Sequence, residues 1–354
     1  MGYEAIKFKE FEFWYYRFSR GEFDLDYDVG SIISNLELSN LHNDAIEKII
    51  EKCDLKEQLT LRKVSKDLRS LVDKQKIAYK SIHIHLMDSH IFCVYNDKKV
   101  VYASENWDEN KQHGGFDNKK SFTIRGEDYV EIALNDLSIA LNNPKLRLDK
   151  LIVSYYYNDR MRLFRLNSLL QHLNHQIHVK ELSVQANVPE DIHKNLLSIL
   201  PCLKPKELVN IGVFVEDPDD WVPEQALKCV KEIANLEQWK QAEELTLDLF
   251  NLFPLEFVMN FKRFDIFTSG LDEDFLMNLR DLFSMSTNFQ SCTVGTYGIL
   301  SSCTEYLESV CERMKSGDPS VVLYHCKIPE NSSKIFEFKV DYNEYQIDIE
   351  KKNF

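Results

Sequence analysis

A short apolar motif recurs along the C-terminal two thirds of this 354-residue sequence. It reads apolar, two residues, apolar, one residue, apolar, and this spacing is typical of a strand that buries one face. The clear copies are Leu148, Leu151 and Val153; Val179, Leu182 and Val184; Phe261, Phe264 and Ile266; and Phe289, Cys292 and Val294. The weaker copies are Leu208, Ile211 and Val213, and Leu245 with Leu247.

Segments with apolar residues three and four apart lie between the copies and predict helices. They span 163–173, 191–203, 224–239, 272–285 and 304–314. A strand and a helix of about 20 to 30 residues cannot bury both apolar faces alone, whereas stacked neighbours share one core. We therefore expect an α/β fold, α+β overall, in which residues 127–326 form an irregular βα solenoid similar to leucine-rich repeats, with a parallel sheet on its inner face. Asn187 stands where such a repeat carries asparagine.

The tail and the segment before the repeats predict antiparallel strands. Two β-rich runs around Asn96 predict a small meander within 81–103. Its His83 and His85 have no third ligand at supporting spacing, so we expect them on the solvent-facing side of a half-buried strand rather than on a metal. The polar stretch 106–118 predicts a mobile loop. A final hairpin with its turn at Asn343 and Glu344, closing the sheet edge, is indicated by Ile335, Phe338, Val340, Tyr345, Ile347 and Ile349.

Residues 41–73, LHNDAIEKIIEKCDLKEQLTLRKVSKDLRSLVD, predict two short amphipathic helices and a third, longer one, with tight connections at Asp54 and Lys63. Asp54 suits an N-cap, and Ser65 with Asp67 marks the next helix start. A unit of this length is too small to sustain a core alone, so its apolar residues must be covered by the rest of the chain or by another protein.

This segment resembles the F-box. The matching positions are Leu41, Asp44, Ile46, Ile49, Leu55, Leu59, Leu61, Val64, Ser65 and Leu68. His42 departs from the pattern, since the family usually has Pro there and Pro at the first helical position fixes the backbone in advance. The resemblance implies binding to the Skp-type adaptor of an SCF-type cullin ubiquitin ligase through Leu41, Ile46, Ile49, Leu55, Leu59, Leu61, Val64 and Leu68. The alternative is a three-helix linker buried against its own chain.

The repeat region looks like the FTH domain that nematode F-box proteins carry after the F-box. The resemblance runs from about Lys145 to Met314 and is concentrated in KELVNIGVF, IANLEQWKQAEELTL and FKRFDIFTSGLDEDFLMNLRDLFSMSTNFQSC. Nothing in it requires catalysis. If the region is repeat-like, its strand face should bind a target protein, although loops on the helix side could serve equally. The strand-face residues are Ile152, Ser154, Ser183, Gln185, Thr246, Asp248, Asp265 and Phe267.

Aromatic residues in two other places raise the same choice between core and interface. Trp239, at the end of a predicted helix, is expected in the core. The tyrosines at 155–157 end a strand that cannot bury all three, and we leave open whether they anchor a partner.

The front of the chain carries an aromatic helix, with Phe11, Trp14, Tyr15 and Phe18 at helical spacing and Gly21 as its C-terminal cap. It looks like the tail of the helix-turn-helix domain of mariner-type transposases. DNA binding needs a local excess of Lys and Arg, yet the segment continues with Glu22, Asp24, Asp26 and Asp28. We expect a relic helix whose aromatic face packs on the next domain.

Composition excludes several classes of function. The formal net charge of −14 and a pI of about 5.3 argue against nucleic-acid and anionic-membrane partners, although 62–80 is locally basic. No signal peptide and no span of about 20 apolar residues is present, so we expect an intracellular protein, cytoplasmic or nuclear or both. The eight cysteines form no C-x-x-C pair and predict isolated buried thiols in a reducing compartment.

Signatures of enzymes are absent: there is no phosphate-binding glycine loop, no G-x-S-x-G and no H-E-x-x-H. His172, His175 and His178 share a spacing that can bind metal, but no carboxylate or cysteine completes a site. We expect no cofactor and no metal.

The sequence thus predicts four parts: a transposase-like remnant at 1–36, an F-box at 37–78, a meander linker at 79–126 and an FTH, repeat-like recognition domain at 127–354. The predicted function is substrate recognition in an SCF-type ubiquitin ligase. The alternatives are a non-catalytic repeat-type interaction module and a transposase-derived DNA-binding protein.

Overall fold

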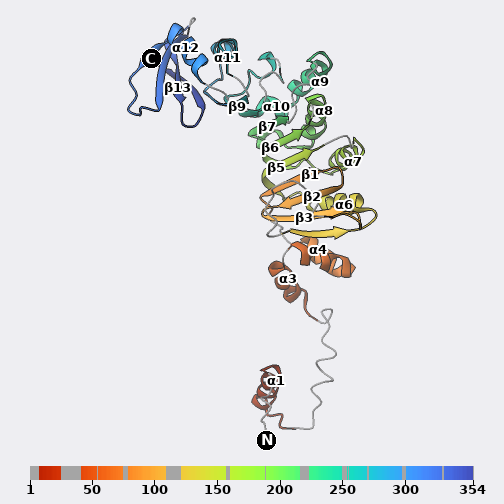
Figure 1. Ribbon diagram of the computed structural model, residues 1–354. Helices are drawn as coiled ribbons and strands as arrows, with labels where there is room; N and C mark the ends of the chain where they lie inside the picture. Colours follow the sequence, from red (N-terminus) through yellow and green to blue (C-terminus); the bar gives the residue numbers. More distant parts are fainter. Residues whose placement is uncertain are drawn as a thin grey trace. The chain divides into compact units, whose positions relative to one another are not determined.

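The computed structural model describes residues 8–24, 41–53, 55–74, 79–108, 121–156, 160–187, 189–215, 223–248, 253, 255–268, 271–296, 300–328 and 331–353. The chain divides into two compact units, Met1–Lys76 and Ile77–Phe354. Figure 1 gives the order of their helices and strands. The predicted N-cap at Asp54 and nearly all of the predicted loop at 106–118 lie outside the described residues.

The first unit contains α1 (Phe8–Ser19), whose end follows the prediction. Gly21 has φ +80°, and its N–H donates to the carbonyl of Phe18 at 3.1 Å, while Glu22 N–H donates to Arg17 at 3.1 Å. Glycine reaches this left-handed conformation without a Cβ clash, so Gly21 caps the helix as predicted. Tyr15 is 61% exposed and Phe18 is 39% exposed.

The described residues of this unit contain three further helices: α3 (Asn43–Lys52), α4 (Leu55–Val64) and α5 (Lys66–Lys74). The start of α5 is capped as predicted, because Ser65 Oγ accepts the N–H of Leu68 at 3.1 Å. The predicted connection at Lys63 was misplaced by two residues, since α4 continues through Val64 and the break falls at Ser65. The third helix is not longer than the others in its described part.

The second unit is built on a 14-stranded sheet in the described part of the chain, with strand order β11-β12-β13-β14-β10-β9-β8-β7-β6-β5-β1-β2-β3-β4. The strands are β1 (Ser81–Leu86), β2 (His90–Tyr95), β3 (Lys98–Ala103), β4 (Ser121–Arg125), β5 (Arg147–Tyr155), β6 (His178–Ala186), β7 (Asn210–Val215), β8 (Glu244–Leu247), β9 (Arg263–Thr268), β10 (Ser291–Thr296), β11 (Glu312–Met314), β12 (Val321–Ile328), β13 (Asn331–Asp341) and β14 (Gln346–Asn353).

The strands from β5 to β10 run parallel to one another, and each contains all or part of one copy of the apolar motif. Helices connect them: α6 (Tyr129–Leu141) precedes β5, and α7 (Arg160–Gln171), α8 (Pro189–Ile199), α9 (Pro223–Asn235), α10 (Glu237–Gln241) and α11 (Glu273–Met285) follow in turn. Short 3₁₀ turns span Leu200–Cys202, Pro205–Glu207 and Leu255–Phe257. The expected alternation of strand and helix is therefore confirmed except between β8 and β9, where the described residues contain only the 3₁₀ turn Leu255–Phe257.

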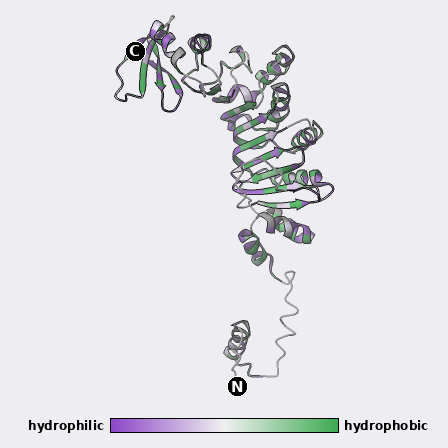
Figure 2. Ribbon diagram, in the orientation of Figure 1, coloured by the Kyte–Doolittle hydropathy of each residue, from purple (hydrophilic) through white to green (hydrophobic). Residues whose placement is uncertain are grey.

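The apolar motif supplies the core. Its residues Leu151, Leu182, Ile211, Leu245 and Phe264 are partners across five strands and are at most 5% exposed. In Figure 1, α6, α7, α8 and α9 lie on one side of the strands, and Figure 2 shows apolar and polar residues interleaved along them. We call the opposite side of these strands the polar face.

The predicted meander of β1, β2 and β3 is antiparallel, as expected. It is also continuous with the repeats, because β1 pairs in parallel with β5. The prediction for His85 was wrong: it is 5% exposed and stacks on Phe92 with ring centroids 4.2 Å apart. The faces of an imidazole ring are apolar enough to pack against another aromatic ring. His85 is therefore buried instead of facing solvent.

The end of the chain differs from expectation in two respects. The predicted helix at 304–314 stops early, since α12 (Ser301–Val310) is followed by strand β11. The hairpin of β13 and β14 forms as predicted, but it does not close the sheet. Instead β14 pairs with β10, and β13 continues through β12 to the edge strand β11.

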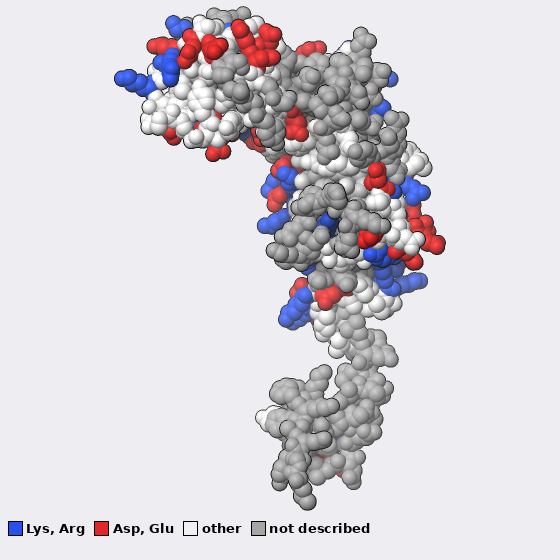
Figure 3. Space-filling model, in the orientation of Figure 1, with Lys and Arg blue, Asp and Glu red and all other residues white. Residues whose placement is uncertain are grey.

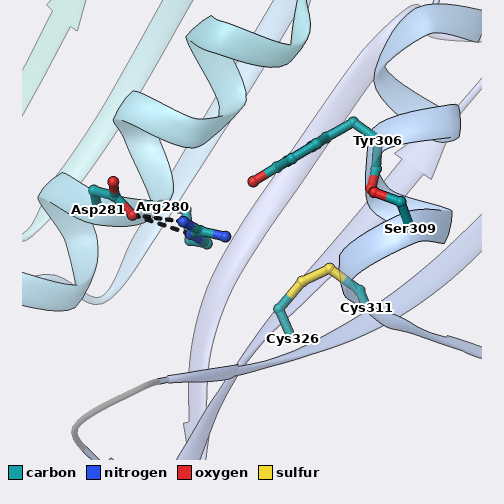
Figure 4. The surroundings of a disulfide bond; sticks show 6 residues. All are labelled: Arg280, Asp281, Tyr306, Ser309, Cys311 and Cys326. Atoms are coloured by element: carbon teal, nitrogen blue, oxygen red, sulfur yellow. Dashed lines mark hydrogen bonds and ion pairs between the residues drawn. A yellow bond between two sulfur atoms is a disulfide. The ribbon is translucent and has the colours of Figure 1, made fainter.

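Two of the eight cysteines are joined, contrary to the prediction of isolated thiols. Cys311, the C-cap of α12, forms a disulfide with Cys326 on β12, and their Cα atoms are 4.5 Å apart (Figure 4). The sequence hid this pair because the two cysteines are 15 positions apart and only the return of β12 beside β11 brings them together. The other six cysteines form no disulfide.

Candidate interaction surfaces

The F-box-like segment has a small core of its own. Ile46 and Ile50 of α3 pack with a cluster of α5 residues, Leu68, Leu71 and Val72. Leu41 and Leu61 lie against this cluster. Ile46 is 6% exposed and Leu68 is 8% exposed, so these two of the expected adaptor-binding residues shape the segment from within and do not face outward.

Ile49 and Val64 behave in the opposite way. Ile49 is 42% exposed on α3 and Val64 is 66% exposed at the end of α4. Large aliphatic side chains left in water cost about 25 cal/mol for each Å² that a partner could cover. The side-chain exposure of Leu55 and Leu59 lies outside what the structure describes.

A side-chain amide holds α3 and α4 together. Gln58 Nε2 donates to the carbonyls of Ile50 at 3.1 Å and Cys53 at 3.0 Å. The Ile50 carbonyl lies in the last turn of α3 and also accepts the N–H of Cys53 at 3.1 Å, and Cys53 is the C-cap of the helix. The bonds fix the angle between the helices that carry Ile49 and Val64.

His42 is the N-cap of α3 rather than its first residue. Its backbone is extended, with φ −63° and ψ 145°, and its Nδ1 accepts the N–H of Asp44 at 3.5 Å, the long limit of a hydrogen bond. The histidine therefore takes a backbone conformation that proline would also adopt, and offers a weak cap in its place.

The residues expected to bind a target all lie on the polar face or at the end of its strands, but the structure separates them by exposure. Ser154 is 0% exposed and Ser183 is 4% exposed, so neither can touch a target in this form. Both are short side chains, and Ser154 Oγ donates to Oε1 of Gln185 at 2.5 Å. Ile152 is half-buried, as is Gln185.

The accessible part of the set lies on β8 and β9. Asp265 is exposed, Phe267 is 36% exposed, and Thr246 and Asp248 are half-buried. Burial raises the pKa of Asp248 to about 6, with a smaller contribution from the charge of Asp265 and an opposing backbone hydrogen bond from Val215. Burial likewise raises the pKa of Asp265.

Sequence reasoning missed three residues beside this set. Phe214 of β7 is half-buried on the same face. A Cβ on Gly212 would lie 2.8 Å from Cε2 of Phe214, and a Cβ on Gly295 would lie 2.9 Å from Cδ2 of Phe267. Both distances are shorter than carbon atoms tolerate. A glycine in a strand signals such a close approach, and that signal was present in the sequence.

Trp239 is in the core, as predicted. It is 1% exposed, its Nε1 donates to the carbonyl of Phe257 at 2.8 Å, and its ring lies 4.9 Å from that of Phe253. Of the three tyrosines, Tyr155 is buried and Tyr156 is half-buried, while 157 lies outside the described residues.

Within the described ranges, no group of three His, Cys, Asp or Glu side chains could hold a metal ion. No helix in that part of the chain is both long and apolar enough to cross a bilayer.

Comparison with known proteins assigns both regions. Residues 38–80 match the family described as F-box domain, and residues 163–310 match the family described as FTH domain. The chain carries an F-box domain followed by an FTH domain.

A curated relative, "F-box A protein 224" of Caenorhabditis elegans, is 22% identical over 302 residues, which cover 82% of this chain and 74% of the relative. No solved structure matches the chain. The F-box is the domain that binds a Skp-type adaptor in SCF-type ubiquitin ligases, and the exposed Ile49 and Val64 lie within it.

Proposed function

We propose that this protein is a substrate-recognition subunit of an SCF-type cullin-RING ubiquitin ligase. Its F-box would bind the Skp-type adaptor and through it the cullin scaffold, while its FTH domain would bind a target protein. The match of residues 38–80 to the F-box domain carries this proposal. The exposure of Ile49 and Val64 supports it, because an adaptor would remove both side chains from water.

The expected set of adaptor-binding residues divides into two roles in this proposal. Ile49 and Val64 would contact the adaptor, together with Leu55 and Leu59. Ile46 and Leu68 would hold the helices in place from the core of the segment, with Leu41 and Leu61 packed against them. This division follows from burial, since a side chain already covered by its own chain gains nothing further from a partner.

The FTH domain would present its polar face to the target. We propose that it is an irregular leucine-rich-repeat-like solenoid, supported by the parallel order of β5 to β10 with connecting helices. The accessible residues of β8 and β9 would contribute most, since Ser154 and Ser183 are buried. Catalysis would be positional: the protein would raise the concentration of its target near a ubiquitin-charged enzyme.

The remaining proposals concern the domain boundaries of the chain and the cellular location of the protein. We propose the parts 1–36, 37–78, 79–126 and 127–354, the first being a relic of a transposase helix-turn-helix, and a protein that acts in the cytoplasm, the nucleus or both. The view in Figure 3 supports a protein partner over DNA. Among the charges that it displays, Lys and Arg alternate with Asp and Glu over the described surface.

Co-expression with a Skp-type adaptor and a cullin tests the proposal. The wild-type chain should co-elute with both in size-exclusion chromatography. The double variant Ile49→Asp, Val64→Asp should elute alone, whereas Val310→Asp, which places the same charge on an exposed valine outside the F-box, should co-elute. Failure of the wild type to co-elute would instead favour a repeat-type interaction module without a ligase role.

A further inference from the structure

The junction of α4 and α5 exposes basic side chains around an aliphatic one. Lys63, Lys66 and Arg69 are exposed, and we call these three residues the basic corner. Val64, which lies between the first two in the chain, is 66% exposed. Among the described residues, no side chain of the basic corner forms an ion pair. Asp67 adds one exposed carboxylate, so this surface carries a net positive charge in a chain whose formal net charge is −14.

Two hydrogen bonds hold Arg69 across this junction. Its backbone N–H donates to the carbonyl of Ser65 at 3.0 Å, and its Nε donates to the carbonyl of Arg62 at 3.3 Å. Arg62 lies in the last turn of α4, two residues before Val64. The guanidinium of Arg69 is therefore held beside the end of the helix that carries Val64.

Lys66 stands at a position where helix stability disfavours a cation. Ser65 Oγ accepts the N–H of Leu68 at 3.1 Å, so Ser65 is the N-cap of α5 and Lys66 is the first residue of that helix. The N-terminus of a helix carries a partial positive charge, which favours acidic residues and disfavours lysine. Asp67 follows this preference, whereas Lys66 opposes it. The stability of α5 therefore does not account for the lysine.

We propose that the basic corner contacts an acidic surface of the Skp-type adaptor, beside the apolar contact made by Val64. This deepens the proposed function, on whose adaptor-binding role it rests. The basic corner is continuous with that interface, because Lys63 and Val64 are adjacent in the chain and both side chains are exposed. The adaptor would carry carboxylates at the rim of the apolar surface that covers Val64.

A protein surface fits this junction better than a nucleic acid does. The exposed side chain of Val64 gains free energy from burial against apolar atoms, and a phosphate backbone offers charge instead. An apolar centre with a polar, solvent-accessible rim is the common arrangement of protein–protein interfaces. Val64 with the basic corner has this arrangement.

Charges at the rim of an interface act mainly on the rate of association. Complementary charges steer two surfaces together, and salt screens this attraction over about 8 to 10 Å. Steering by the basic corner would matter in this chain, because its net negative charge alone would repel an acidic partner. The proposal therefore predicts an association rate that falls as salt is added.

Surface plasmon resonance with the full chain and an immobilised Skp-type adaptor tests this contact. Raising the NaCl concentration from about 50 to about 500 mM should slow association of the wild type about tenfold and change its dissociation rate little. At the lower concentration, Lys66→Glu should slow association about threefold. The double variant Lys63→Glu, Lys66→Glu should slow it about tenfold.

Two controls separate the contact from effects on folding and on net charge. Lys66→Glu places an acidic residue at the N-terminus of α5, which that end of a helix favours. Its midpoint of urea unfolding should therefore not fall, although its association slows. Lys145→Glu, Lys206→Glu reverses two exposed lysines of the second unit and should associate with the adaptor as fast as the wild type.

Four outcomes would overturn the inference and leave the ligase proposal standing. They are adaptor binding at a rate independent of salt, an unchanged or faster rate in Lys63→Glu, Lys66→Glu, an equal loss in the control variant, and a lower urea midpoint in Lys66→Glu. Absence of adaptor binding at every salt concentration would overturn both proposals. A parallel surface carrying duplex DNA gives the remaining outcome: binding by the wild type that Lys63→Glu, Lys66→Glu abolishes would assign the basic corner to nucleic acid and overturn the inference.

Discussion

His42 shows how one residue can set the quality of a helix start. It occupies the N-cap of α3 with φ −63°, within the range that proline imposes, and caps the helix only through a 3.5 Å contact. Replacing it with proline would reduce the freedom of the unfolded chain at a position whose folded backbone already fits.

We therefore expect His42→Pro to raise the free energy of unfolding by about 0.4 to 1 kcal/mol. Urea unfolding followed by circular dichroism would measure the difference, with His42→Ala as the control that removes the side chain without restricting the backbone. A proline variant no more stable than the alanine variant would contradict this account of the cap.

The sequence predicted the burial of a side chain well at positions where the adjacent residues of the chain determine that burial. The apolar positions of the repeats, Gly21 and Ser65 behaved as their local patterns indicated. His85 did not, because its burial depends on Phe92 of the adjacent strand and on no neighbour in sequence. Ser183 was expected on the surface because alternation along a strand predicts the face of the sheet on which a side chain lies. Alternation does not predict whether neighbouring side chains cover it.

At the scale of elements, the meander carries buried histidines whose charge matters to stability. Burial lowers the pKa of His85 to about 3, with contributions from His83 and Lys99. Burial also lowers the pKa of His90 to about 4, with contributions from Lys99 and Arg162. Both groups are neutral when folded, and their unfolded pKa is 6.5.

Because the unfolded chain binds more protons than the folded chain below pH 6.5, stability should fall as pH drops from 6.5 towards 4. Thermal unfolding across this range would measure the effect. In His85→Gln and His90→Gln the melting temperature should depend less steeply on pH than in the wild type. An unchanged slope in both variants would show that other groups control the acid response.

The disulfide stabilises the terminal elements in a way that depends on redox state. Cys311 and Cys326 close a loop that contains β11, and a loop of about 15 residues is worth roughly 3 kcal/mol in chain entropy. We expect a reducing agent to lower the free energy of unfolding by about this amount.

Urea unfolding with and without the reductant would measure that loss. Cys311→Ser should be as unstable as the reduced wild type and insensitive to reductant. Cys229→Ser, which changes a free and partly exposed thiol, should respond to reductant as the wild type does. Equal stability of the oxidised and reduced wild type would contradict the stabilising role.

Elements were predictable in type more than in extent. The alternation of strands and helices followed from periodicity, whereas the stop of α12 at Val310 did not, because residues 312–314 become a strand only by pairing with β12. The edge of the sheet was mispredicted for a similar reason. β14 pairs with β10, which is far from it in the sequence, and a local sequence pattern cannot predict such a pairing.

At the scale of the whole molecule, the chain consists of two compact units with separate proposed roles. The F-box would supply the connection to a ligase and the FTH domain the choice of target, so changes in one should leave the other intact. We expect Asp248→Asn, Asp265→Asn, which changes only the second unit, to co-elute with the Skp-type adaptor like the wild type.

Size-exclusion chromatography of this variant with the adaptor would check this independence. The two sets of residues lie in separate compact units, and mutations without shared partners usually act additively. Loss of adaptor binding in Asp248→Asn, Asp265→Asn would show that the units are coupled.

The central claim is that a second polypeptide covers Ile49 and Val64. Hydroxyl-radical footprinting of the full chain, read by mass spectrometry, reports the accessibility of these side chains directly. On addition of a Skp-type adaptor, the oxidation of Ile49 and Val64 should fall, while that of Val310, exposed outside the F-box, should stay the same. Unchanged oxidation of Ile49 and Val64 at saturating adaptor would contradict the claim.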